Sequence, residues 1–166
     1  MLYTKEHPRG LDVLIQKLQT KIYKSLKTDK IEGYGRVYLN DDNGKIVPKH
    51  YLGNGEDKEL LLNDRLTGSF FFFEDGVTKK KSSRLTTPVS LVILLNLEEL
   101  TLNFKGRNDE EVKTDIYGVI EPCKYFDLIE IIKGDDVLKE FKTNFKEKHP
   151  YCFLRFNGTM SYQGIY

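Results

Sequence analysis

A run of nine residues in the middle of the chain, 89–97 (VSLVILLNL), contains only two polar side chains, Ser90 and Asn96. Successive side chains of a strand point to opposite faces, so a run this apolar buries both of its faces. It is too short for a transmembrane helix, which needs about 20 apolar residues. The run therefore predicts a central strand in a sheet that is covered on both sides.

In two further segments, the apolar residues are spaced as on one side of an α-helix. In residues 8–26, apolar side chains recur at intervals of three, four and seven, so that they form one stripe on a helix. Residues 109–120 show a shorter stripe of the same kind, which ends before Pro122. Each stripe needs an apolar surface to lie on. Both helices are therefore expected on one side of the sheet that contains residues 89–97.

Other segments favour strands, because they are rich in aromatic and β-branched residues. They are residues 31–39, 45–52, 67–74, 125–132 and 151–162. Pro48 predicts an edge position for the second of them, since proline cannot donate to a ladder. Residues 100–104 either extend a strand or turn away. The whole pattern predicts one α+β domain over residues 1–166, with a mostly antiparallel sheet and two long helices packed on one side.

The charge balance limits the classes of partner. Lys and Arg total 26 and Asp and Glu total 25, for a formal net charge of +1. This near-neutrality excludes a protein that wraps nucleic acid over most of its surface, but it leaves room for a local basic patch. Cys123 and Cys152 match no metal or redox spacing, so we expect two reduced packing residues in a cytosolic chain. No segment predicts a membrane span.

Candidate catalytic residues are sparse. Asp127, Glu130 and Lys133 have the composition of a metal-dependent nuclease site, but the two acids have opposite parity on a strand and are not expected to face one ion. The chain has no phosphate-binding glycine motif. We therefore expect no catalytic residue, no metal, no cofactor and no enzymatic activity. Three histidines have no partner at metal-ligand spacing: His7, His50 and His149.

Residues 77–87 form a polar excursion between the strands at 67–74 and 89–97, which predicts an antiparallel hairpin with an extended loop. One interpretation of this loop is a solvated hairpin tip that also blunts aggregation. The other is a phosphate-binding surface, which would screen a few phosphates without reading sequence and would weaken in salt. The four cations of the loop are Lys79, Lys80, Lys81 and Arg84.

The second face of the sheet raises the question of what covers it. The chain supplies only enough helix for one face, yet both faces of the two central strands are apolar. Neighbouring subunits in a ring would cover the second face through a heterologous interface. The alternative is that the sheet folds on itself, or that the long loops lie across it. The candidate interface residues on this face are Phe70, Phe72, Val92 and Leu94.

The order of these elements also carries a resemblance. A leading helix (LDVLIQKLQTKIYKSL) is followed by a glycine-rich strand, a GNGE loop at 53–56 and a phenylalanine strand. After these come VSLVILLNL, a DEEV helix start at 109–112 and a last strand that begins in HPYCFLRF. Over about residues 11–162 the chain resembles the tail-completion and tail-terminator proteins of tailed bacteriophages, especially the neck ring proteins of short-tailed crAss-like phages.

That resemblance implies a structural role in the virion. Such proteins form oligomeric rings in the head–tail connector, between the portal or adaptor and the tail, and genomic DNA passes through the lumen. The chain would be made in the bacterial cytoplasm and would end in the neck of the virion. The family has no active site to carry over. The basic loop would then contact DNA or the next ring, and the alternative function is a small nucleic-acid-binding module that uses this loop without sequence specificity.

Overall fold

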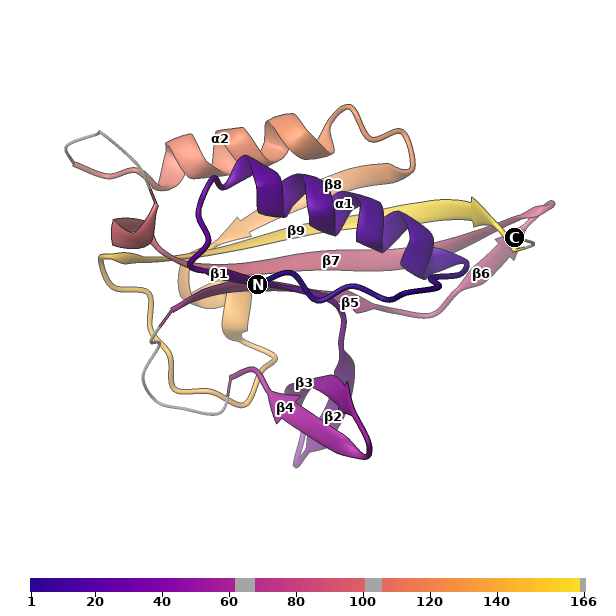
Figure 1. Ribbon diagram of the computed structural model, residues 1–166, viewed down its shortest axis with the longest axis horizontal. Coiled ribbons are helices and arrows are strands. Elements are labelled where there is room, and N and C mark those ends of the chain that lie inside the picture. The colour runs from indigo at the N-terminus through magenta and orange to yellow at the C-terminus, as the bar shows by residue number, and fades with distance from the viewer. Residues whose placement is uncertain (62–67, 101–105, 165–166) are drawn as a thin grey trace.

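The computed structural model describes residues 1–61, 68–100 and 106–164 (Figure 1). The expectation for residues 100–104 therefore lies almost wholly outside the described residues, as does the first residue of the strand expected at 67–74. In chain order the elements are α1 (Leu11–Ser25), β1 (Ile31–Arg36), β2 (Tyr38–Asp42), β3 (Lys45–Gly53), β4 (Glu56–Glu59), β5 (Ser69–Asp75), β6 (Lys79–Lys81), β7 (Arg84–Asn96), the 3₁₀ turn η1 (Leu97–Glu99), α2 (Asp109–Ile120), β8 (Phe126–Lys133), the 3₁₀ turn η2 (Gly134–Leu138) and β9 (Tyr151–Gln163).

The main sheet has the strand order β1-β5-β7-β9-β8, and β6 pairs with the far end of β7. Only β1 and β5 run parallel, while the other described pairs are antiparallel. The expected central strand is present as β7, which extends back to Arg84 and pairs with β9 along its whole length. The predicted hairpin is also present, since Phe71 of β5 lies opposite Ile93 of β7.

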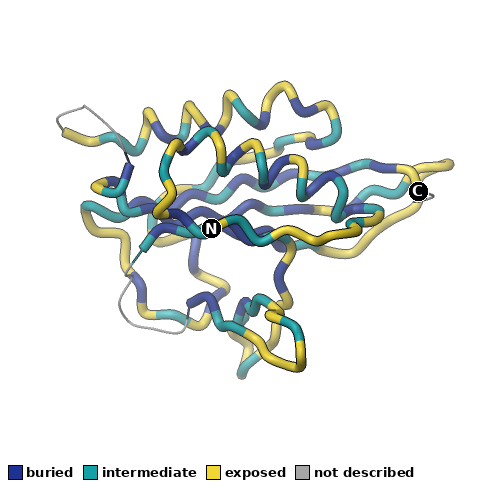
Figure 2. The backbone as a smooth tube through the Cα atoms, in the orientation of Figure 1, coloured by how far each residue is buried: buried dark blue, intermediate teal, exposed yellow. Residues whose placement is uncertain are grey.

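The two helices lie on one face of this sheet, which we call the helix face (Figure 1). Leu14, Leu18 and Ile22 of α1 are buried against the same core as Ile116 of α2. The sheet side of this core includes Phe71, Leu91, Ile93, Leu154 and Phe156, all of which are fully buried. The tube in Figure 2 shows the resulting alternation of buried and exposed turns along both helices.

The opposite face, which we call the second face, is covered by the chain itself. Phe72, Val92 and Leu94 are 0% exposed and pack in a second core. The residues that cover them come from η2 and the segment after it, from β1 and from the end of β4: Val137, Leu138, Phe141, Phe145, Tyr34, Val37, Leu60 and Leu61.

This second core corrects the expectation that neighbouring subunits must shelter the face. Loops and short segments cover it, which was the alternative left open by the sequence. Phe72, Val92 and Leu94 are core residues of a single chain and present no surface to a partner. Phe70 is partly exposed and packs at the margin of the same core.

A separate three-stranded antiparallel sheet, β2-β3-β4, is inserted between the parallel strands β1 and β5. This small sheet hangs below the main sheet in Figure 1, and it supplies the crossover that a parallel pair requires. The predicted edge position of Pro48 is wrong, because β3 is the middle strand. The β3–β4 ladder ends at the pair of Lys49 and Glu59, so Pro48 lies just outside it. The carbonyl of Pro48 accepts from Leu60 N at 3.0 Å, and its lack of an N–H removes no bond of that ladder.

The α+β class predicted from the sequence is confirmed, with a mixed sheet that is largely antiparallel and two helices. Among the described residues, no helix is both long enough and apolar enough to cross a membrane.

Candidate functional site

The four cations expected to form a contact surface lie together at the tip of the β6–β7 hairpin. Lys79, Lys80 and Lys81 form β6, and Arg84 begins β7 after a turn at Ser82, which has a φ of 58°. All four side chains are exposed. Within the described part of the chain, none of them lies in an ion pair. The hairpin therefore presents four positive charges at one end of the molecule, with no ion-pair partner among residues 1–61, 68–100 and 106–164 (Figure 1).

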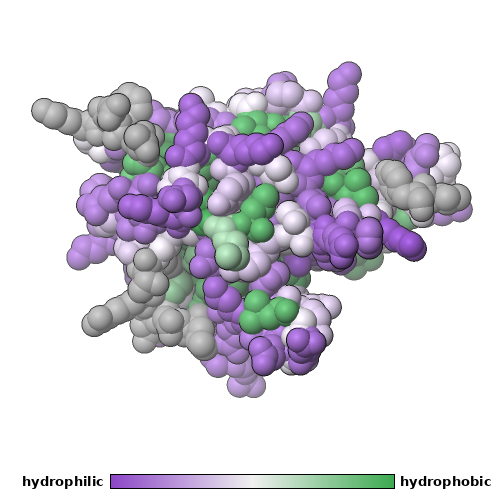
Figure 3. All heavy atoms as spheres, in the orientation of Figure 1, coloured by the Kyte–Doolittle hydropathy of each residue, from purple (hydrophilic) through white to green (hydrophobic). Residues whose placement is uncertain are grey.

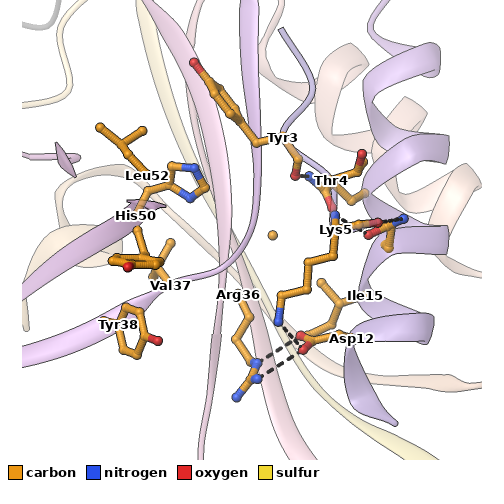
Figure 4. Close-up of a pocket in the computed structure, with 14 residues that line it drawn as sticks. Tyr3, Thr4, Lys5, Asp12, Ile15, Arg36, Val37, Tyr38, His50 and Leu52 are labelled. Atoms are coloured by element: carbon orange, nitrogen blue, oxygen red, sulfur yellow. Dashed lines mark hydrogen bonds and ion pairs between the residues drawn. The ribbon is translucent and has the colours of Figure 1, made fainter. Parts of the chain in front are cut away.

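A cavity of about 560 Å³ lies between the N-terminal segment, α1, β1 and the small sheet (Figure 4). This volume is in the range of small-ligand and peptide sites. The N-terminal segment is held beside β1, since Tyr3 N donates to Gly33 O at 2.8 Å and Gly33 N donates to Met1 O at 2.9 Å. The lining residues include Tyr3, Lys5, Asp12, Gln19, Arg36, Tyr38, His50, Tyr51 and Leu52.

One side of the cavity is an ion cluster around Asp12. Lys5 Nζ lies 2.5 Å from Asp12 Oδ2, and Arg36 Nε donates to Asp12 Oδ1 at 3.0 Å. Arg36 also reaches Asp75 at 3.4 Å. Burial alone would raise the pKa of Asp12, but the hydrogen bonds from Arg36 and Lys5 outweigh it and lower that pKa below its usual value. The carboxylate is thus charged and fully engaged, so it is not a free base.

Another side of the cavity is aromatic. The rings of Tyr3 and Tyr34 stack at 4.7 Å, and His50 lies 4.8 Å from Tyr34. Burial and the neighbouring charge of Lys58 lower the pKa of His50, so this imidazole is neutral at pH 7. Burial and the hydrogen bond to Glu32 raise the pKa of Tyr34 well above its usual range. Lys58 and Glu32 pair at 2.9 Å, and both side chains contact the hydroxyl of Tyr34.

The described lining of the cavity combines aromatic and aliphatic side chains with charged groups that are paired with one another. Its described lining holds neither serine nor cysteine. Gln19 is 1% exposed and donates through Nε2 to Tyr3 O and Gly33 O, so its position is fixed by the backbone. The sequence did not single out this cavity, because it joins segments that are far apart in the chain.

The outer wall of the cavity belongs to an exposed apolar surface on the small sheet. Tyr38 is 62% exposed and Leu52 is 52% exposed, and Tyr51 contacts Tyr38 edge to face at 6.5 Å. We call Tyr38, Tyr51 and Leu52, which all line the cavity, the arm surface. Leu39 follows Tyr38 in β2 and projects from the opposite face of the small sheet. A hydrophobic patch over the small sheet is visible in Figure 3. Large apolar side chains that stay exposed together often mark a contact with another molecule.

The acids considered for a nuclease lie differently from the expectation. A bulge between Leu128 and Glu130 shifts the register of β8, so that Asp127 faces Thr159 and Glu130 faces Asn157 on the same side of the sheet. The parity argument against this pair is therefore wrong. Lys133, however, pairs with Leu154 on the helix face. Among the described residues, no three His, Cys, Asp or Glu side chains group as metal ligands.

The cysteines and the remaining histidines lie apart from the cavity. Cys123 and Cys152 are free and buried. Burial raises the pKa of Cys152 to about 12, so its thiol is not reactive at neutral pH. His7 and His149 are exposed, in the N-terminal segment and before β9.

No protein-family model matches the chain, and no curated protein matches it either.

Proposed function

We propose that this chain is a structural subunit of a tailed-phage head–tail connector, a tail-completion or tail-terminator-like protein that forms a ring and passes genomic DNA. The observation that supports the proposal most is the arrangement of elements. A leading helix and a late helix lie on one face of a largely antiparallel sheet, in the order that the resemblance implies. A structural role also agrees with a cavity whose charged groups are already paired.

In this proposal the subunit contact involves the arm surface. The second face of the main sheet is covered by other segments of the same chain, so it is not available to a neighbouring subunit. Tyr38, Tyr51 and Leu52 remain exposed at a different place on the molecule. A patch that meets a different patch on the next copy makes a heterologous contact, and such contacts generate rings when the rotation closes.

The mass of the native assembly tests this proposal. The purified chain, alone or mixed with its portal-side or tail-side neighbour, is expected to form a closed oligomer with a fixed subunit number. Native mass spectrometry and analytical ultracentrifugation would both report that number. A chain that stays monomeric over all concentrations and with both neighbours would contradict the proposal.

The hairpin cations favour a second candidate function, a small module that binds nucleic acid without sequence specificity. Four exposed cations that pair with no carboxylate of the described residues are suited to phosphates. A salt titration of duplex DNA binding by the monomer separates the two candidates. Binding by a chain that never assembles would favour this second function.

A further inference from the structure

The second face of the main sheet is covered over only part of its length. Val92 and Phe153 are buried in the second core, but the same strands continue past it with polar side chains. In Figure 1 the small sheet hangs below the middle of the main sheet, while β6 and the ends of β7 and β9 extend beyond it. Six residues of β7 and β9 that project from the second face in this extension are partly or fully exposed. We call them the polar strip: Thr86, Pro88, Ser90, Asn157, Thr159 and Ser161.

The strand register decides which hairpin cations share the side of the polar strip. Lys79 lies opposite Thr86, and Lys81 lies opposite Arg84, so these three cations project from the second face. Lys80 lies opposite Leu85, which packs against the core on the helix face. The four cations of the sequence are therefore divided three to one between the two faces of the hairpin.

We propose that the polar strip, together with Lys79, Lys81 and Arg84, is a contact surface for the phosphate backbone of duplex DNA. The proposal rests on the proposed function, since it names the surface that would face the DNA. Hydroxyl, amide and cationic side chains are the groups that contact phosphate oxygens in proteins. A protein partner fits less well, because the centre of a protein interface is apolar and the strip has no large apolar side chain.

Hydrogen bonds within the strip hold its polar groups in place. Thr86 Oγ1 lies 3.1 Å from Ser161 Oγ, and Ser90 Oγ donates to Asn157 Oδ1 at 2.6 Å. Arg84 Nη2 donates to Ser161 O at 3.0 Å, which directs the guanidinium along the sheet. The polar groups of the strip are thus held in a fixed arrangement on paired strands.

Two acids limit where the DNA can lie. Asp127 and Glu130 of β8 project from the same face. Asp127 lies opposite Thr159 of the strip, and Glu130 Oε1 accepts from Asn157 Nδ2 of the strip at 2.9 Å. They would repel phosphates, so the DNA backbone is expected to follow β6, the β7 side of the strip and the end of β9 at Ser161. From Arg84 to Ser90 the strip is about 20 Å long at ~3.4 Å per residue, which corresponds to about six base pairs of duplex. The three cations would neutralise about three phosphates.

Fluorescence anisotropy with a labelled 30-base-pair duplex of random sequence tests the proposal, using the full chain and a series of salt concentrations. Three phosphate contacts predict a slope of about −2.7 in log affinity against log salt, or a loss of about 40-fold between 50 and 200 mM salt. The variant with Lys79→Ser, Lys81→Ser and Arg84→Ser is expected to remove nearly all of that slope. Asp127→Asn is expected to strengthen binding several-fold.

Lys80→Ser is the matched control, because it removes the same charge from the same hairpin on the opposite face. It is expected to change the slope by much less than the single variant Lys81→Ser. Equal losses for Lys80→Ser and Lys81→Ser would overturn the assignment of a face, and so would the absence of salt-dependent binding by the wild-type chain. A third outcome would also overturn the proposal: the wild-type chain does not bind DNA, and the triple variant loses self-assembly. The polar strip would then be a contact between two copies of the chain. The mass of the native assembly tests the ring separately.

Discussion

Arg155 is a charged residue at the margin of the second core, opposite the buried Val92. Its side chain is 13% exposed, and its guanidinium pairs with Glu74, which is 10% exposed on the side chain, and with Glu140. Arg155 Nε also donates to Asn157 Oδ1 at 2.8 Å. Burial lowers the pKa of Arg155 to about 10, which still leaves it charged at neutral pH. The charge is therefore retained inside the fold because its partners are in place.

The variant Arg155→Met is expected to lower the free energy of unfolding by about 3–5 kcal/mol, since it leaves the carboxylate of Glu74 buried without a cation. Adding Glu74→Gln should recover part of that loss, because the amide carries no charge. Urea unfolding of the single and double variants measures both effects. Equal losses in the two variants would mean that packing, and not the unpaired charge, controls the result.

The arginine itself was visible in the sequence, on the same strand face as Phe153, but its partner was not. Glu74 lies on β5 and Arg155 on β9, with β7 between these two strands in the sheet. Their side chains pair across β7, which only the strand order reveals. The bulge that brings Asp127 and Glu130 to one face is equally hidden, because alternation along a strand assumes an unbroken register. Side-chain types are readable from sequence, whereas pairing across strands depends on register.

At the scale of elements, the long periodic segments could be predicted and the short ones could not. The spacing in α1, α2 and β9 is regular over more than ten residues, and the structure places these elements within a few residues of the expected ranges. The segment 31–39 was expected as one strand, but it is divided between two sheets. Val37 N bonds to Phe73 O in the main sheet, and Tyr38 then begins the small sheet. A change of sheet leaves no periodic signal.

The contact between β8 and β9 depends on a glycine. A Cβ at Gly158 would lie 2.5 Å from Asp127 O and 2.7 Å from the ring of Phe126, and the first of these atoms belongs to the backbone. Gly158→Ala is therefore expected to destabilise the chain by about 1–3 kcal/mol, as overpacking does. Gly118→Ala in α2 is the control, because a Cβ there meets open space, and it should stabilise by about 0.5–1 kcal/mol. Thermal unfolding of both variants compares them, and a neutral Gly158→Ala would mean that β8 moves freely.

At the scale of the whole molecule, the structure separates two apolar surfaces that the sequence could not distinguish. Both the phenylalanine strand and the small sheet contain large apolar side chains, but only the first is closed by the chain's own segments. Which surface is covered depends on η2 and the residues after it, whose polar and mixed composition gave no sign of a covering role. Burial by a loop is a property of tertiary packing, so composition does not predict it.

Variants of these two surfaces should behave in opposite ways. Tyr38→Ser with Leu52→Ser removes exposed side chains, so the free energy of unfolding should change by no more than about 0.5 kcal/mol at each site, while the assembled oligomer is lost. Phe72→Ala opens a cavity in the second core and should lower the free energy of unfolding by about 3–5 kcal/mol, with or without assembly. Native mass spectrometry at one protein concentration measures assembly, and urea unfolding of the same samples measures the free energy of unfolding. If Phe72→Ala instead left the monomer stable and abolished assembly, the sheet face and not the arm surface would be the subunit contact, and the covering segments would have to move aside when copies meet.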